Sequence, residues 1–298
     1  MNKIVITSSR PLDLDKIAAS GQCFRWAPGP IAGSYLIPAS GRCAALYSLD
    51  GAIHVVDYTV SGGSHPAAPD YRGSLHFWEN YLGLPEAAHW WEELETYARR
   101  EPESYITRAA ASAYGMTLLR QDPFETLISF IVSQNNNIPR IKASIEALCR
   151  RHGRRHYVPT AKGNFPGAEW WDFPEPEALT DKDKLQGLGL GYRDEYVAAA
   201  ARAVASGSLS LSVLSITPHL EARARLKSLL GVGGKVAECV CLYGLGMTQA
   251  FPVDVHIRRV LEREFPEGFP FHRFPENAGF IQQLLFYHEL HPGEAAGK

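Results

Sequence analysis

Residues 226–260 decide the fold of this chain; they read LKSLLGVGGKVAECVCLYGLGMTQAFPVDVHIRRV. A Leu-rich helical segment ends at Leu230, the turn 231–234 follows, and a second helical pattern opens with Lys235. Apolar or small residues then recur with helical spacing as far as Leu245. The pattern predicts two helices joined by a tight, Gly-rich turn.

The turn Gly231-Val232-Gly233-Gly234 is suited to binding phosphate. It exposes several backbone N–H groups at the start of the second helix, where the helix dipole also places a partial positive charge. It differs from the nucleotide-binding loop GxxxxGK[ST], which is longer and follows a strand. We therefore expect this turn to hold a phosphate with little dependence on base sequence.

Lys235 lies in the first turn of the second predicted helix, where the helix dipole disfavours a cation. One interpretation is a solvated lysine, or one that contacts phosphate. The other is a nucleophile, because the positive potential favours a neutral amine that can attack a sugar C1′, release the base and leave a Schiff base. Cys239, one helical turn later, shares its face and is either part of a base pocket or a buried core thiol.

Asp254 follows Pro252-Val253 and precedes a further helical pattern that contains Ile257 and Val260. An ordinary N-cap explains this position well. A capping carboxylate at a cleft can also stabilise a cationic sugar in a transition state, so the two roles are compatible. His256 could orient a phosphate or simply help to cap.

The composition is that of an ordinary globular protein, with 298 residues, 45% hydrophobic and 21% charged, and a net charge of −2. This charge counts mildly against nucleic acid, although backbone amides can hold phosphate. No apolar run is long enough to span a membrane, and residues 1–13 lack a signal-peptide core, so we expect a soluble protein of the cytoplasm or nucleoid. The five cysteines form no CxxC pair and none follows Cys241, so we expect free thiols and no iron–sulfur cluster.

The chain is predicted to be an α+β protein, mostly helical, with a small antiparallel sheet at its N-terminus. Strand-like runs lie at 3–7, 34–37, 43–47 and 53–58, and Asp50-Gly51 is a hairpin signal. We expect a sheet domain over 1–115 and a helical region over 116–298. Within the latter, we expect a helix-hairpin-helix at about 219–246 and a last helix at about 276–290.

Two further predicted helices are joined by a polar turn. Asp122-Pro123-Phe124-Glu125 is a helix start, with Asp122 as its cap. The apolar pattern breaks at 133–137, where Asn135, Asn136 and Asn137 stand together, and a helix resumes near Pro139. Hydrogen bonding within an Asx turn is one reading of the three amides, and contact with base edges is the other.

Three remaining stretches are rich in Gly or Pro. Residues 61–73 and 152–176 are predicted to be loops. Residues 185–193 suit either a plain helix–helix turn or a close approach to a partner, with Tyr192 and Arg193 at a tip that could wedge into DNA.

Together these segments resemble the helix-hairpin-helix–GPD superfamily of DNA base-excision glycosylases, and more closely its 8-oxoguanine DNA glycosylase/lyase family. The motifs that carry the resemblance are Gly21–Trp26, Leu119–Glu125, Asn135–Ile138, Leu188–Arg193, Leu230–Ala237, Val253–His256 and Ala278–Phe286. They are dispersed along most of the chain and follow one another in family order.

The resemblance implies a role for each matching residue. Lys235 is expected to be the Schiff-base nucleophile and Asp254 the essential carboxylate. The expected base-binding groups are the carbonyl of Gly21 for the N7–H of 8-oxoguanine, Cys239 and Phe286 for the two base faces, and Gln282 for the Watson–Crick edge. The expected DNA-binding residues are Asn135, Arg140 and Arg193 for the orphaned cytosine, Tyr192 as the wedge, and Gly231, Gly233 and His256 for backbone phosphate.

The resemblance implies a monomeric base-excision repair enzyme that flips out and removes 8-oxoguanine and related oxidised purines from double-stranded DNA. The lesion would preferably lie opposite cytosine, and a lysine Schiff base would support AP lyase activity by β-elimination. No metal ligands or cofactor are expected, apart from a structural cation that the hairpin carbonyls can hold.

Two alternatives remain open. The first is a glycosylase for alkylated or other damaged bases on the same fold, although such enzymes often lack the lysine. The second is a non-catalytic helix-hairpin-helix protein that only binds DNA. The chain departs from the family at Cys23, where many relatives carry Ser, and the motifs do not cover the loops at 61–73 and 157–176.

Overall fold

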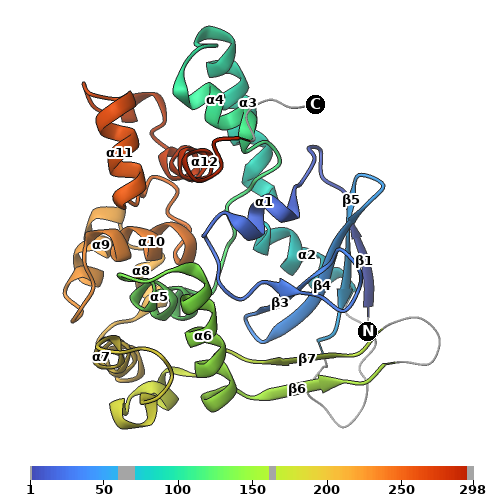
Figure 1. Ribbon diagram of the computed structural model, residues 1–298, viewed down its shortest axis with the longest axis vertical. Coiled ribbons are helices and arrows are strands. Elements are labelled where there is room, and N and C mark those ends of the chain that lie inside the picture. The colour runs from blue at the N-terminus through green and yellow to red at the C-terminus, as the bar shows by residue number, and fades with distance from the viewer. Residues whose placement is uncertain (1, 60–70, 161–165, 294–298) are drawn as a thin grey trace.

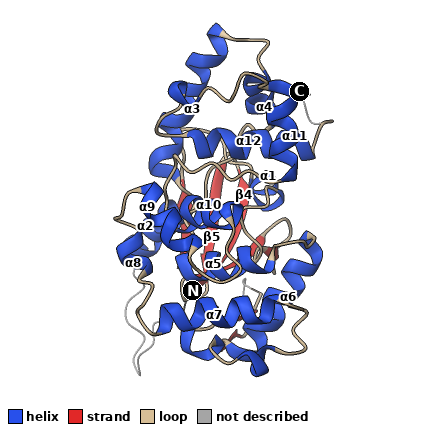
Figure 2. Ribbon diagram, turned by 90° about the vertical axis from the view of Figure 1, so that its left-hand side faces the viewer, coloured by secondary structure: helices blue, strands red, loops and turns tan. Residues whose placement is uncertain are grey.

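The fold is an N-terminal antiparallel sheet with helices stacked against it, as a computed structural model describes for residues 2–59, 71–160 and 166–293. Figure 1 places the sheet on the right and most of the helices on the left and at the top. In the view of Figure 2, helices lie in front of the strands and cover them. The expected α+β class, mostly helical with an N-terminal antiparallel sheet, is confirmed.

The sheet has five strands in the order β1-β5-β4-β3-β2. They are β1 (Asn2–Ile6), β2 (Ala27–Pro28), β3 (Tyr35–Ala39), β4 (Arg42–Leu49) and β5 (Ala52–Asp57). The hairpin at Asp50-Gly51 joins β4 to β5, and both residues have left-handed φ angles, 50° and 76°, as a two-residue turn between twisted strands requires. The four predicted strands and this turn are confirmed.

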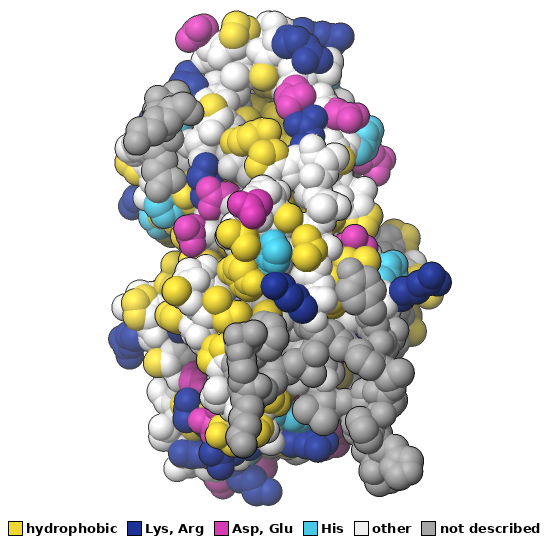
Figure 3. Space-filling view, turned by 90° about the vertical axis from the view of Figure 1, so that its right-hand side faces the viewer, with side chains coloured by type: hydrophobic (Ala, Val, Ile, Leu, Met, Phe, Trp, Pro, Cys, Tyr) yellow, Lys and Arg dark blue, Asp and Glu magenta, His cyan; other side chains and the backbone are white. Residues whose placement is uncertain are grey.

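One face of the sheet packs on α1 (Leu14–Ala19) and α2 (Tyr71–Tyr81). Ile4, Leu46 and Val55 alternate onto this face and are buried against Ile17 and Trp78. Figure 3 looks onto the sheet side of the molecule, where hydrophobic side chains gather across the middle of the face.

The other face of the sheet is covered in part by a hairpin that the sequence did not predict. Its strands, β6 (Arg155–Val158) and β7 (Ala168–Trp171), pair antiparallel and reach back to the sheet (Figure 1). Ala168 and Trp170 are buried with Cys43 and Val56 of the sheet. The prediction of a loop over 152–176, and of its part 157–176, was therefore wrong for these strands. Four-residue strands that include charged residues give too weak a period-2 signal, and their burial depends on a distant partner.

The loop predicted at 61–73 is wrong at its end, because residues 71–73 open α2. The rest of that stretch lies outside the described residues.

The other helices follow in chain order. They are α3 (Leu84–Arg100), α4 (Tyr105–Ser112), α5 (Pro123–Val132), α6 (Ile138–His152), η1 (Pro176–Leu179), η2 (Lys182–Leu185), α7 (Arg193–Ala205), α8 (Leu211–Leu214), α9 (His219–Lys227), α10 (Gly234–Cys239), η3 (Val240–Gly244), α11 (Val255–Glu264), η4 (Phe271–Arg273) and α12 (Ala278–Leu290). Within the described ranges, no helix is both long and apolar enough to cross a membrane.

Several helices begin where the sequence places a cap. The side chain of Asp122 accepts hydrogen bonds from the backbone N–H groups of Phe124 and Glu125, at 2.9 and 2.8 Å, so α5 starts as predicted. Asn137 caps α6 through the N–H of Arg140, and the N–H of Asn137 donates to Asn136, so the Asx hydrogen bonding that was one reading of the three amides is present.

The helix-hairpin-helix is formed by α9, the turn 228–233 and α10. The helix expected to run on to Leu245 changes character at Val240, where the residues of η3 form a π-helix and Leu245 N–H donates to Val240 O over 2.9 Å. Gly244 lies in this wider turn against α5, where an added Cβ would be 3.1 Å from both Pro123 and Thr126.

One hydrophobic core joins the two ends of the chain. It extends from Phe24 to Tyr287, and within it the ring of Phe280 in α12 lies 5.3 and 5.4 Å from the rings of Trp90 and Trp91 in α3. The C-terminal helix therefore has a fixed place beside the N-terminal segment.

Candidate active site

Lys235 occupies the first turn of α10, as predicted, and its side chain is half-buried. Its charge acts on the buried thiol of Cys239, one helical turn along, and its Nζ lies 4.8 Å from the centre of the Phe130 ring. Burial raises the pKa of the Cys239 thiol to about 11, against the opposing effect of the Lys235 charge. At physiological pH the Cys239 thiol is therefore neutral, one helical turn from the Lys235 amine.

Asp254 caps α11, as predicted. Its Oδ1 accepts from the backbone N–H groups of His256 and Ile257, at 3.0 and 2.8 Å. Its charge also acts on the buried thiol of Cys239, where it raises the pKa, while the charge of Lys235 lowers it. The charges of the amine and the carboxylate, 19 residues apart in the chain, therefore both act on the same buried thiol.

The ring of Phe130 lies under the amine of Lys235. The sequence analysis did not identify Phe130 as a site residue. Its ring lies 5.5 Å from Phe24 in an edge-to-face contact and 5.5 Å from Tyr243 in a stacked one. A cation over an aromatic face is held in place by the ring quadrupole. The only available signal was an aromatic residue on the apolar face of α5, which also fits a plain core residue.

The C-terminal helix lies beside the predicted base-contact residue Gly21. A Cβ atom added at Gly21 would lie 3.2 Å from Cε1 of Phe286. Gln283 of the same helix donates to the carbonyl of Ser20 over 2.8 Å, which fixes this approach. The ring of His256 lies 6.1 Å from that of Phe286, so α11 joins the same cluster.

Gln282 and Gln283 are adjacent and both buried, yet their surroundings differ. Gln283 donates to Ser20 and accepts from the Tyr243 hydroxyl. The Oε1 atom of Gln282 is buried and has no hydrogen-bond partner among the described residues. A buried acceptor without a donor costs free energy, and this distinguishes Gln282 from Gln283.

Asn135, Tyr192 and Arg193 lie together at the turn between α5 and α6. The side-chain amide of Asn135 donates to the Tyr192 hydroxyl over 3.1 Å, and Tyr192 is half-exposed. The Arg193 guanidinium is buried and donates to the carbonyls of Gln134, Asn135 and Leu190. In this state Arg193 therefore holds the turn together.

A second tyrosine connects this tip to the hairpin. The rings of Tyr192 and Tyr196 lie 5.7 Å apart, and Tyr196 packs so closely on Gly231 that an added Cβ would be 2.3 Å from its ring. Only glycine fits there, and its φ of 78° also requires glycine. The exposed Gly233 is the N-cap of α10, and Arg140 is exposed in the first turn of α6.

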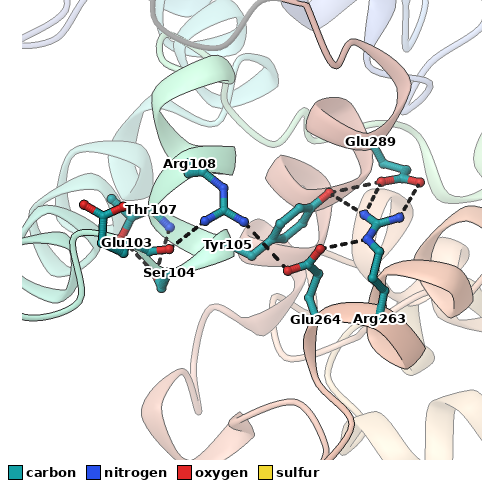
Figure 4. Close-up of polar contacts among 8 residues, drawn as sticks. All are labelled: Glu103, Ser104, Tyr105, Thr107, Arg108, Arg263, Glu264 and Glu289. Carbon is teal, nitrogen blue, oxygen red and sulfur yellow. Dashed lines mark hydrogen bonds and ion pairs between the residues drawn. The ribbon is translucent and has the colours of Figure 1, made fainter.

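An ionic network ties the far ends of α11 and α12 to α4 (Figure 4). Arg263 donates to Glu289 over 2.7 Å, and the Tyr105 hydroxyl donates to the same carboxylate over 3.1 Å. The hydrogen bond from Arg263 holds the pKa of Glu289 below its ordinary value. This network fixes the relative position of the helix that Asp254 caps and the helix that carries Phe286.

Most of the predicted site residues form three groups, which do not include Gln282, Arg140, Gly231 and Gly233. Lys235, Asp254 and Cys239 form the first; Gly21, Phe286 and His256 form the second; Asn135, Tyr192 and Arg193 form the third. Over residues 2–59, 71–160 and 166–293, no cluster of three or more His, Cys, Asp or Glu side chains could hold a metal ion.

Two family models match consecutive parts of the chain. The 8-oxoguanine DNA glycosylase N-terminal domain matches residues 3–127, and the HhH-GPD superfamily base excision DNA repair protein matches residues 128–267. An N-glycosylase/DNA lyase of Saccharomyces cerevisiae is 39% identical over 53% of this chain, and a probable N-glycosylase/DNA lyase of Methanothermobacter thermautotrophicus is 32% identical over 61%. The matched regions span 44% and 66% of those relatives' own lengths.

Solved structures cover nearly the whole chain. The structure of MBOgg1 in complex with a low affinity DNA ligand has a TM-score of 0.81 and 30% identity, and the match covers 98% of this chain and 97% of that one. A Clostridium acetobutylicum 8-oxoguanine glycosylase/lyase, in complex with dsDNA containing cytosine opposite to 8-oxoG, has the same fold, with a TM-score of 0.80 at 24% identity and coverage of 98% and 96%. On these matches, the chain belongs to the 8-oxoguanine DNA glycosylase family of the HhH-GPD superfamily.

Proposed function

We propose that this chain is a bifunctional DNA glycosylase and AP lyase that removes 8-oxoguanine from double-stranded DNA. The observation that carries the proposal is that Lys235, held with its Nζ 4.8 Å from the centre of the Phe130 ring, and Asp254, fixed as the cap of α11, both act electrostatically on the buried thiol of Cys239. An amine nucleophile and a fixed carboxylate are the pair that base removal through a Schiff base requires. The S. cerevisiae relative, an N-glycosylase/DNA lyase, and the MBOgg1 complex with DNA support it.

The chemistry begins once the damaged nucleotide is turned out of the duplex, which costs about a few kcal/mol. Lys235 first loses its ammonium proton to solvent, and its amine then attacks C1′ of the sugar as the bond to the base breaks. The electron pair of that bond leaves with the base, which takes up a proton. The carboxylate of Asp254 stabilises the positive charge that develops on the sugar, and its position is fixed by the two N–H groups that it caps.

The lyase step follows from the covalent intermediate. Ring opening of the sugar gives a Schiff base between Lys235 and C1′. Loss of a proton from C2′ then expels the 3′ phosphate, which breaks the strand by β-elimination. Hydrolysis of the remaining Schiff base returns the lysine amine.

Lesion choice would come from the second group of residues and from Gln282. The Gly21 carbonyl would accept the N7–H that 8-oxoguanine has, whereas guanine would present a lone pair to it and be repelled. Gln282, whose Oε1 has no partner among the described residues, would bind the Watson–Crick edge. Cys239 and Phe286 would line the two faces of the base.

The third group and the hairpin would hold the DNA. Tyr192, half-exposed at the tip, would fill the gap that the flipped base leaves. Asn135, Arg140 and Arg193 would contact the cytosine. Gly231 and Gly233 in the hairpin, together with His256, would contact phosphate.

The hairpin would take a cation only through backbone oxygens. The carbonyl of Leu229 accepts from Val232 N–H over 3.1 Å and retains a second lone pair. Neutral carbonyl oxygens suit a hard cation, which would screen the phosphate charge at this turn.

The test is borohydride trapping on a duplex with 8-oxoguanine opposite cytosine. The wild-type protein should form a covalent adduct, and Lys235→Gln should form none while it still binds the lesion duplex. The matched control is Lys227→Gln, an exposed lysine on the other helix of the hairpin, which should trap as the wild type does.

Two results would overturn the proposal. Absence of an adduct with the wild-type protein would leave a DNA-binding hairpin without catalysis. Faster release of an alkylated purine than of 8-oxoguanine would make the chain an alkylation-repair glycosylase. Substrates with adenine, guanine or thymine opposite the lesion test the expected preference for cytosine.

A further inference from the structure

We propose that Glu238 is a positioning residue that sets the distance between Lys235 and Asp254. It lies in α10, three residues after Lys235, and its carboxylate is mostly buried, with 13% of the side chain exposed. A buried carboxylate costs free energy unless it is paired and hydrogen-bonded, so its contacts define its role. Glu238 acquires this role only if the chain has the proposed function.

Two contacts of Glu238 reach the first helix of the hairpin. Its Oε2 lies 2.9 Å from His219 Nε2, and its Oε1 lies 2.5 Å from Arg223 Nε, both in α9. The Arg223 guanidinium also touches the hairpin, because its Nη2 would lie 3.5 Å from a Cβ added at Gly234. The two contacts of Glu238 hold α9 against α10.

The third contact leaves the hairpin. Oε2 of Glu238 accepts a hydrogen bond from the backbone N–H of Phe251 over 3.2 Å. Phe251 stands three residues before Asp254, and its ring is packed at 4.7 Å from Phe269. Pro252 follows and restricts the backbone, so the segment between Phe251 and Asp254 has little freedom.

One carboxylate therefore fixes both catalytic groups relative to each other. Along the helix it is tied to Lys235, and through the Phe251 N–H it is tied to the segment that ends in Asp254. Small misplacements of reacting groups cost large factors in rate, on the order of a hundredfold for about 1 Å. Loss of this contact should therefore lower the chemical rate more than the affinity for DNA.

Two variants separate the hydrogen bond with Phe251 N–H from the negative charge of Glu238. Glu238→Gln keeps an oxygen that can accept from Phe251 N–H but loses the charge that pairs with His219 and Arg223. Glu238→Ala loses both. The matched control is Glu221→Ala, which removes a carboxylate of α9. Among the described residues it pairs with Arg225 alone, at an exposed site, 2.7 Å away and four residues along the same helix.

The measurements are the single-turnover rate of base release, the rate of borohydride trapping and the dissociation constant for lesion DNA. We expect Glu238→Ala to lower both rates by about tenfold or more and to change the dissociation constant by less than about threefold. Glu238→Gln should recover most of the rate, because the bond to Phe251 remains. Glu221→Ala should behave as the wild type.

Three outcomes would overturn the positioning role. The first is a Glu238→Ala rate within twofold of the wild type. The second is a loss of DNA affinity that accounts for the whole loss of rate, because Glu238 would then only support the hairpin. The third is a Glu238→Gln protein as slow as Glu238→Ala. If Glu238→Ala does not fold, the rate of Glu238→Gln is compared with that of the wild type instead. A Glu238→Gln protein that is slower by about tenfold or more then overturns the positioning role. A wild-type protein without trapping activity would instead overturn the proposed function.

Discussion

The ring of Phe286 lies against the backbone of Gly21, although 264 residues separate them in the chain, and an added Cβ at Gly21 would be 3.2 Å from Cε1 of that ring. Gly21 also has a φ of 74°, a left-handed angle that favours glycine. The N-terminal segment and the C-terminal helix thus form one wall of the proposed base pocket.

Gly21→Ala should displace Phe286 and slow the release of 8-oxoguanine by about tenfold or more, with little change in DNA binding. The matched control is Gly33→Ala, where φ is 71° but an added Cβ would meet no atom within 4 Å. Both variants should lose about 1–2 kcal/mol of stability from the left-handed backbone. Equal release rates for the two variants would show that the contact with Phe286 does not shape the pocket.

Gln282→Met should leave the free energy of unfolding unchanged or raise it, because it removes a buried acceptor without a donor, which costs about 1–3 kcal/mol. Release of 8-oxoguanine should fall in the same variant. Gln283→Met, one residue along, should lower the free energy of unfolding, because it leaves Ser20 O and the Tyr243 hydroxyl without their partner. Urea unfolding and single-turnover kinetics on both proteins check this, and a Gln282→Met protein less stable than Gln283→Met would contradict it.

Asp254→Asn should keep the cap of α11 and lose the charge, because Asn caps helices about as well as Asp. We expect a stability within about 0.5 kcal/mol of the wild type and a base-release rate lower by about a hundredfold or more. Asp254→Ala should in addition lower the free energy of unfolding by about 1 kcal/mol. The pair Asp122→Asn and Asp122→Ala makes the same changes at the cap of α5 and should affect stability alone. Full activity in Asp254→Asn would show that Asp254 acts only as a helix cap.

The Glu289 network predicts a pH dependence of stability. The hydrogen bond from Arg263 lowers the pKa of Glu289 from its ordinary value of 4.5, so the folded state favours the ionised form. This stabilisation is present above pH 4.5 and is lost as the pH falls through the lowered pKa. Because the Arg263 side chain is half-exposed, we expect only about 0–1 kcal/mol.

Urea unfolding of the wild type and Glu289→Gln at pH 7, 5 and 3 measures this contribution. The difference between the two proteins should be largest at pH 7 and should shrink toward pH 3. The control Glu101→Gln breaks a more exposed pair with Arg273 and should differ less from the wild type at pH 7. A difference that grows as the pH falls would contradict the assigned direction.

The parts of the fold that the sequence predicted are those set by local chemistry. The cap at Asp122, the turn at Asp50-Gly51 and the start of α10, at Gly234 where Lys235 was predicted, each depend on residues within one or two turns. The hairpin of β6 and β7 depends on a sheet face about 110 residues earlier, so no local pattern predicted it.

The same division holds for the candidate site. The motif that begins at Gly21 was singled out as a whole, and within it Gly21 lies against Phe286. Gln22 instead bonds Thr117 O and Leu119 N–H, and Arg25 pairs with Glu125 at 3.1 Å. Contacts of this kind, like that of Glu238 with Phe251, join residues whose proximity exists only after folding.

The hairpin of β6 and β7 has a consequence for how the chain is made. During synthesis the five-stranded sheet leaves the ribosome about 100 residues before the strands that cover Cys43 and Val56. Until then this apolar face is open to other nascent chains, and a bare sheet face is prone to aggregation. A pause in translation shortly after β5 should therefore lower the yield of native protein, whereas a pause after β7 should not.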